Sequence, residues 1–256
     1  MILIVGASGA TGRLLTGELL NRGEQVRIIV RPGSELPDAV RDHKNLTVVR
    51  AGILDLSKDE LIQHVKDCQA VASCLGHNIT LKGVFGHPRR LVTEAVRRLC
   101  GAVKKVKPAL PVKYVLMNTV GNKNRDIPEK VSLPQDILFG MLRILVPPQA
   151  DNENAADFLR VEIGQNDPDI EWAAVRPDSL VDDSAVSDYE IFPSPIRSAI
   201  FNPGKTSRIN VAHFMAELIT NSELWTQWKG QMPVIYNKEK NFFIAQDPAT
   251  AGDKRE

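Results

Sequence analysis

Three glycines near the start of the chain have the spacing of a phosphate-binding loop. Gly6, Gly9 and Gly12 follow the apolar run at 2–5 and precede a segment whose leucines recur at helical spacing. Gly6 permits a tight turn out of a strand, Gly9 lets the backbone approach a phosphate, and Gly12 lets the helix pack closely. The free N–H groups of a first helical turn attract an anion. A surface turn would also use glycine, but the strand and helix on either side favour a dinucleotide loop. The residues expected at the phosphates are Gly6, Ser8, Gly9, Ala10, Thr11 and Gly12.

An arginine at the end of the second predicted strand distinguishes between the two nicotinamide dinucleotides. NAD sites usually carry a carboxylate there, whereas the 2′-phosphate of NADP needs a cation. The residue is Arg31, and Arg13 after the glycine loop offers a second guanidinium. Two planar guanidinium groups can each donate a pair of parallel hydrogen bonds to a phosphate dianion. The alternative is a pair of solvated surface arginines, but the pattern favours NADP over NAD.

Further candidates follow the third and fourth predicted strands. Asp55 and Leu56 are expected at the adenine edge, and Leu75 and Gly76 beside a ribose; an ordinary strand-end turn is the alternative in both cases. The loop after the fourth strand contributes His77, Asn78 and His87. A histidine there would relay a proton or hydrogen-bond a substrate, or would simply be solvated.

Apolar strands alternate with helical segments along most of the chain, which is typical of a buried parallel sheet. This alternation predicts an α/β class: a Rossmann, doubly wound, mostly parallel sheet with helices on both faces and a small C-terminal substrate-side extension. Ser57 and Glu60 predict a capping box. Pro147 and Pro148 are expected to end an apolar helix at 137–146, and 178–206 to be loop-rich. Expected strands lie at 2–5, 25–31, 46–51, 70–76, 112–118, 172–176 and 233–237, and expected helices at 35–42, 58–66, 89–107, 154–164 and 210–219.

Length and composition fit a single domain at 1–245, with substrate-side elements mainly at 121–150 and 178–240 and a disordered tail at 246–256. The net charge of +1 argues against nucleic acid and membrane surfaces as partners. We expect a small-molecule substrate, a monomer or homodimer, and no metal cluster. Three cysteines without metal-ligand spacing favour reduced thiols and a cytoplasmic location.

Three segments together resemble a known family. They are the glycine loop 6–13, the run Met117-Asn118-Thr119-Val120-Gly121, and the run Val175-Arg176-Pro177-Asp178-Ser179-Leu180. The chain resembles the atypical short-chain dehydrogenase/reductase group over about residues 1 to 220, most closely its NAD(P)H-binding, NmrA-like branch, which includes flavin and biliverdin reductases of the B type. The resemblance implies a cofactor across the carboxyl ends of the strands. It adds Asn118, Pro177 and Ser179 as cofactor contacts.

The resemblance also implies a catalytic candidate and a departure from the family pattern. Thr119 would donate to a substrate carbonyl, or else satisfy backbone groups at the strand end. The tyrosine and lysine used by most of the superfamily align with Gln149 and Glu153, which cannot supply a proton in that way. The Tyr236 and Lys240 pair has the right spacing, but we expect it at the surface.

Two functions remain open. One is an NADPH-dependent oxidoreductase that transfers hydride to a small, planar, conjugated acceptor such as a flavin, quinone or enone. The other is a non-catalytic NADP(H)-binding sensor, regulator or assembly factor.

Overall fold

An eight-stranded sheet forms the centre of the protein. The computed structural model describes residues 1–77, 89–129, 134, 138, 140–141 and 146–238. The strand order is β3-β2-β1-β4-β5-β6-β10-β8, and every neighbouring pair is parallel except β10 with β8. These strands are β1 (Ile2–Val5), β2 (Val26–Val30), β3 (Leu46–Arg50), β4 (Ala70–Ser73), β5 (Val112–Met117), β6 (Ile170–Pro177), β8 (Tyr189–Phe192) and β10 (Val234–Asn237). A separate parallel pair joins β7 (Ser179–Val181) to β9 (Lys205–Ser207).

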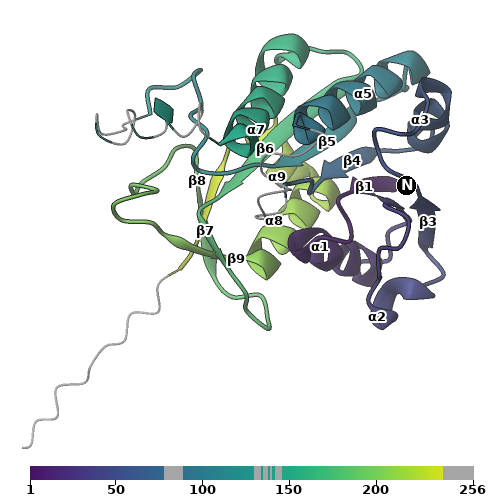
Figure 1. Ribbon diagram of the computed structural model, residues 1–256, viewed down its shortest axis with the longest axis horizontal. Helices are drawn as coiled ribbons and strands as arrows, with labels where there is room; N and C mark the ends of the chain where they lie inside the picture. The colour runs from purple at the N-terminus through teal and green to yellow at the C-terminus, as the bar shows by residue number, and fades with distance from the viewer. Residues whose placement is uncertain (78–88, 130–133, 135–137, 139, 142–145, 239–256) are drawn as a thin grey trace, which may run out of the picture.

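Helices cover both faces of the sheet, which confirms the predicted doubly wound α/β fold. Figure 1 shows α3, α5 and α7 above the sheet and α1 and α8 below it. The helices are α1 (Ala10–Asn21), α2 (Asp38–Arg41), α3 (Lys58–Val65), α5 (Leu91–Val106), α7 (Pro147–Asp157), the π-helix η1 (Phe158–Ile163), α8 (Arg208–Thr220) and α9 (Ser222–Trp228). The predicted capping box of Ser57 and Glu60 begins α3.

The alternation of side chains along each strand creates two separate cores. In β1, Leu3 and Val5 join the cluster under α3 and α5, while Ile2 and Ile4 join the cluster under α1 and α8. All four side chains are completely buried. Burial on both faces explains why the strands read as continuous apolar runs rather than alternating ones.

The order in which successive strands are added to the sheet reverses beside β1. From β1 the sheet grows one way through β2 and β3, and the other way through β4, β5 and β6. In open α/β sheets a crevice forms at this point, outside the carboxyl ends of the strands. The fold therefore brings the ends of β1, β2, β4 and β5 together at one edge.

The two prolines expected after a helix also begin the next one. Pro147 and Pro148 occupy the first turn of α7, where the missing N–H is not needed and the fixed φ suits the helix. The helix expected at 154–164 thus starts earlier, and its last turn is the π-helix η1. Much of the helix expected at 137–146 lies outside the described residues.

The segment 178–206 also holds more regular structure than predicted. It contributes β7, β8 and the start of β9, and α9 follows α8 without having been predicted. Tyr236 is 4% exposed, so its predicted surface position is wrong: it lies in β10, where its ring packs beside Phe192. Lys240 and the tail 246–256 lie outside the described residues.

Candidate functional site

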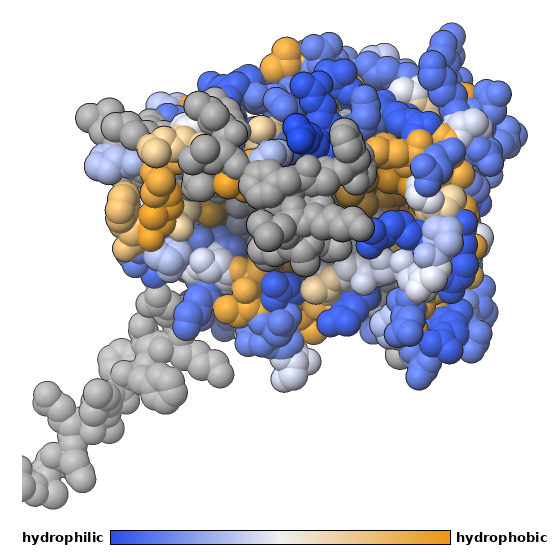
Figure 2. Space-filling model, in the orientation of Figure 1, coloured by the Kyte–Doolittle hydropathy of each residue, from blue (hydrophilic) through white to orange (hydrophobic). Residues whose placement is uncertain are grey.

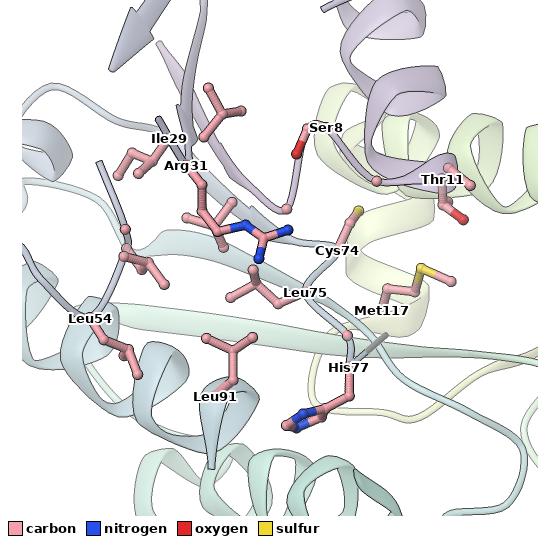
Figure 3. A pocket seen from close by; sticks show the side chains of 18 of the residues that line it. Ser8, Thr11, Ile29, Arg31, Leu54, Cys74, Leu75, His77, Leu91 and Met117 are labelled. Carbon is pink, nitrogen blue, oxygen red and sulfur yellow. The ribbon is translucent and has the colours of Figure 1, made fainter. Parts of the chain in front are cut away.

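A cavity of about 660 Å³ lies at the carboxyl edge of the sheet, where the strand order reverses. It is open to solvent and combines backbone from the glycine loop with apolar side chains at or just after the ends of β1, β2, β3, β4 and β5 (Figure 3). The lining residues are Val5, Gly6, Ser8, Gly9, Ala10, Thr11, Ile29, Val30, Arg31, Ala51, Gly52, Ile53, Leu54, Asp55, Cys74, Leu75, Gly76, His77, Leu91, Met117, Asn118, Asn152 and Leu180.

The glycine loop has no room for side chains at two of its three glycines. Gly6 has a φ of +77°, and a Cβ there would lie 2.6 Å from the carbonyl carbon and oxygen of Cys74. A Cβ on Gly12 would collide with the Gly6 carbonyl oxygen. Gly12 thus lets the first turn of α1 pack on the loop itself. Contacts between backbones explain both requirements without any ligand.

The N-terminus of α1 is open toward the cavity. Gly9 is the N-cap residue and no side chain caps the helix; the first bond back to it comes from Arg13 N to Gly9 O, at 3.0 Å. The amides of the first turn therefore keep their capacity for an anion, and the helix dipole adds to it. Ala10 and Thr11 line the cavity at this turn. This donor set fits a dinucleotide pyrophosphate.

Arg31 is the cation of the cavity wall. Figure 3 shows its side chain extending from the end of β2 into the cavity, with the guanidinium between Ser8 and Leu75. Arg13, the second predicted guanidinium, is exposed on α1 and does not line the cavity. Among the described lining residues, Asp55 is the single carboxylate, and it follows β3 rather than β2.

The loop after β3 forms the side of the cavity expected to hold an adenine. Asp55 lies there with Ile53 and Leu54, and a turn closes between Asp55 N and Gly52 O at 2.9 Å. A Cβ on Gly52 would strike the Asp55 carboxylate. Leu56 instead packs into the core, 7% exposed.

The opposite side of the cavity contains the ends of β4 and β5. Leu75, Gly76 and Asn118, all predicted contacts, line it. Asn118 Nδ2 donates to the Asn152 carbonyl oxygen at 3.0 Å, and its Oδ1 accepts from Thr119 N at 2.8 Å. The cavity wall also includes Leu180 of β7. Three further predicted contacts lie off this wall: Gly12, Pro177 and Ser179.

Thr119 also lies off the cavity wall, one residue beyond Asn118. Its Oγ1 accepts from Gly121 N at 3.2 Å, the strand-end arrangement weighed against a catalytic role. The assignment of Thr119 as the donor to a substrate stays a prediction.

The positions aligned with the tyrosine and lysine face the loop after β5. Gln149 Nε2 donates to Asn122 Oδ1 at 2.9 Å and to Glu153 Oε1 at 3.2 Å. Glu153 is 8% exposed, and Arg125 approaches it to 3.9 Å. Neither Gln149 nor Glu153 lines the cavity. This turn of α7 thus holds the loop after β5 in place.

The site also contains a histidine–aspartate pair that was not predicted from the sequence. His77 lines the cavity, and its Nε2 lies 2.8 Å from Asp151 Oδ2. His77 was a candidate in the sequence, but nothing there connected it to Asp151, since a whole helix and strand separate them. The other loop candidates, Asn78 and His87, lie outside the described residues.

A family model described as NAD(P)H-binding matches residues 6–222, which is most of the chain. The chain belongs to this NAD(P)H-binding family. The match begins at the first glycine of the loop and includes the cavity lining from Gly6 to Leu180. Membership in the family confirms the NAD(P)H-binding part of the resemblance that the three sequence segments predicted.

Solved structures with the same fold as this NAD(P)H-binding protein come from several bacteria. A wide-type short-chain dehydrogenase/reductase from Veillonella parvula, in complex with NADP, is 18% identical with a TM-score of 0.65, covering 92% of this chain and 94% of its own. A putative NADH-flavin reductase from Streptococcus pneumoniae is 14% identical with a TM-score of 0.61, covering 93% and 99%. An anaerobilin reductase from Escherichia coli O157:H7 is 16% identical with a TM-score of 0.64, covering 93% and 98%.

No curated protein matches the sequence of this NAD(P)H-binding protein. Within the described part of the chain, no helix is both long and apolar enough to cross a membrane. The same residues contain no group of three or more histidine, cysteine or acidic side chains arranged to hold a metal ion.

Proposed function

We propose that the protein is an NADPH-dependent reductase that transfers hydride to a small, planar, conjugated acceptor. The observation that carries this proposal is the cavity at the carboxyl edge, which joins the uncapped N-terminus of α1 to the Arg31 guanidinium. The first would bind the pyrophosphate, and the second a 2′-phosphate. When bound, the reduced nicotinamide supplies the hydride.

The preference for NADPH over NADH rests on Arg31. A planar guanidinium binds a phosphate through two parallel hydrogen bonds, whereas ribose hydroxyls are usually recognised by a carboxylate at the end of β2. The described residues offer no carboxylate at that strand end, because Asp55 follows β3. The similar fold of a protein in complex with NADP supports this choice.

The acceptor class follows from the apolar wall of the cavity. Leu75, Leu91, Met117 and Leu180 provide flat apolar contacts, which favour a planar ring system. Gln149 and Glu153 provide no tyrosine–lysine acid, so we favour acceptors that spread negative charge over a conjugated system. The names of two similar structures, a putative NADH-flavin reductase and an anaerobilin reductase, agree with such acceptors.

Oxidation of NADPH at 340 nm with FMN, a naphthoquinone and an enone tests the proposal. We expect turnover with at least one acceptor, faster with NADPH than with NADH. Cofactor binding is measured separately by the fluorescence of NADPH. Binding without oxidation above the enzyme-free rate for the whole panel would rule out the proposed reductase.

A second candidate is a sensor or assembly factor that binds NADP(H) without turnover. Two observations favour it. Gln149 and Glu153 are engaged in internal hydrogen bonds, and two large apolar side chains, Ile196 and Phe201, are 56% and 63% exposed in the loop between β8 and β9. Figure 2 shows hydrophobic surface at the left edge of the molecule, over this loop. Substitution of both by serine would then weaken association with a partner protein while NADP binding is kept.

A further inference from the structure

The pair formed by His77 and Asp151 joins the cavity wall to the start of two helices. The two side chains are 6% and 1% exposed, and His77 Nε2 lies 2.8 Å from Asp151 Oδ2. His77 follows β4, whereas Asp151 belongs to the first half of α7. Figure 3 shows His77 beside the cavity on the far side of Leu75 from Arg31, near Leu91.

The carboxylate of Asp151 is fixed independently of the histidine. Its Oδ2 accepts from Val92 N at 2.8 Å and its Oδ1 from Thr93 N at 3.0 Å. The Thr93 hydroxyl donates to the Asp151 carbonyl oxygen at 2.9 Å. Asp151 therefore satisfies two amides of the first turn of α5, and its position does not depend on His77.

The ring of His77 is oriented by this fixed carboxylate. Nε2 contacts Asp151, which leaves Nδ1 as the second ring nitrogen of a side chain that lines the cavity. A histidine whose one nitrogen is held by a carboxylate has a defined tautomer and a fixed ring orientation. This arrangement is common among general acids and bases, and tyrosine and lysine are not needed for it.

We propose that His77 is the catalytic acid of this reductase and that Asp151 is its positioning residue. The inference rests on the proposed function and adds the proton donor that Gln149 and Glu153 do not supply. It also limits the acceptor class to compounds that take up a proton as well as a hydride during reduction, such as an enone or a related conjugated carbonyl.

The reduction adds one hydride and one proton to the acceptor. The acceptor gains a C–H bond from the hydride that the bound reduced nicotinamide supplies, and the electron pair of its conjugated bond moves toward the carbonyl oxygen. The His77 Nδ1–H bond breaks as the proton passes to the acceptor. Neutral His77 keeps its Nε2–H on Asp151, and water restores the Nδ1 proton. The nicotinamide leaves oxidised.

A structural tether is the competing explanation of the pair. An asparagine at position 77 would still donate an N–H toward Asp151, but it would not transfer a proton. The His77→Asn variant thus separates the two roles. The other charged or titratable groups that line the cavity with His77 are Arg31, Asp55 and the Cys74 thiol. Burial raises the pKa of that thiol to about 12, so Cys74 is a poor proton donor at neutral pH.

The kinetic test compares His77→Asn with a matched control, His64→Asn, whose histidine lies on α3 outside the cavity. We expect H77N to lower kcat with an enone by about 100-fold or more, with little change in the NADPH dissociation constant. The H64N variant should keep the wild-type kcat. If H77N keeps at least half of the wild-type kcat with every accepted substrate, His77 is not the acid.

The pH dependence provides a second readout that does not require H77N to fold. An acid acts only when protonated, so wild-type kcat should depend on pH, and H77N should lose this dependence. In Asp151→Asn, kcat should fall while the NADPH dissociation constant changes little, since an amide does not hold the ring as the carboxylate does. A wild-type kcat that is flat between about pH 5 and 9 would contradict the proposal.

Ring ¹⁵N resonances give a readout that is independent of turnover. The chain contains five histidines, and H77N identifies the signal of His77 by its disappearance. We expect NADP⁺ to shift the His77 signal and to leave that of His64 in place. An unchanged His77 signal at saturating NADP⁺ would overturn the assignment even if the enzyme is active. Absence of wild-type turnover would instead refute the reductase itself, and the acid role with it.

Discussion

The guanidinium of Arg176 and the carboxylate of Glu129 form an ion pair in the interior, 2.7 Å apart, with side chains 0% and 1% exposed. Arg176 also donates from Nε to the Met232 carbonyl oxygen at 2.7 Å and from Nη1 to that of Asn122 at 2.8 Å. Glu129 Oε2 accepts from Asn124 N at 2.9 Å. The pair thus fixes the loop after β5 against β6.

Removal of one partner of this pair should destabilise the protein strongly. The Glu129→Ala substitution leaves a buried guanidinium without its counter-ion, and such changes cost about 3–5 kcal/mol. Urea unfolding followed by circular dichroism measures the loss. The control is Asp182→Ala, which breaks an ion pair with Arg208 in which Asp182 is 79% exposed. We expect it to cost at most about 1 kcal/mol. Equal losses in the free energy of unfolding for the two substitutions would mean that the buried ion pair matters no more to stability than the exposed one.

Two glycines on the same helix should respond in opposite directions to alanine. A Cβ at Gly12 would collide with the Gly6 carbonyl oxygen, whereas one at Gly17 would meet no atom within 4 Å. Gly12→Ala should therefore distort the loop, lower stability and weaken NADP binding at least tenfold. Gly17→Ala should be neutral or stabilise α1 by about 0.5–1 kcal/mol. Thermal unfolding with and without NADP⁺ distinguishes these outcomes, and an unchanged NADP affinity in G12A would contradict the loop assignment.

Neutralising Arg31 should change cofactor preference more than total activity. Arg31→Gln removes the guanidinium that lines the cavity at the end of β2. We expect NADPH affinity to fall about 10- to 100-fold, which corresponds to the loss of a charge-assisted contact, with NADH affinity nearly unchanged. Arg13→Gln, which alters the exposed arginine on α1, should have a smaller effect. A parallel loss of NADPH and NADH affinity in R31Q would show that Arg31 does not read the 2′-phosphate.

The three thiols should react slowly with iodoacetamide in the folded protein. Burial raises the pKa of Cys68 to about 11 and that of Cys74 to about 12, and it raises the pKa of Cys100 further. At pH 8 only a very small fraction is thiolate, which is the reactive form. Mass spectrometry should find few adducts in the native protein and three after denaturation. Rapid labelling of native Cys74 would contradict this environment.

The same thiols make stability depend on alkaline pH. Each holds its proton in the folded state above pH 9, where an unfolded cysteine releases it. The unfolded state therefore binds fewer protons, and the free energy of unfolding should decrease as pH rises above about 9. Urea titrations between pH 7 and 10.5 measure this slope, and a constant stability across that range would contradict it.

Local patterns predicted every strand of the large sheet except β8, most helices and many of the residues that line the cavity. The capping box at Ser57 and the glycine loop at 6–12 depend on neighbours within a few residues, so their chemistry can be read directly from the chain. The start of α7 at Pro147 was not predicted because a proline both follows helices and begins them, and the choice depends on which flanking segment is folded. Tyr236 was misplaced because burial at β10 comes from Phe192 and Gly204, both distant in sequence.

The sequence by itself determined the nucleotide-binding class, because a strand, three spaced glycines and a helix form a loop from residues adjacent in the chain. It also supplied Arg31, since the end of a strand is readable from its apolar run. Only the tertiary structure decided which residues meet. Asp151 reaches His77 because β4 and α7 lie at the same edge of the sheet. Gln149 and Glu153 face the loop after β5 because α7 packs beside that loop. Such contacts depend on how distant elements pack, and no local pattern encodes them.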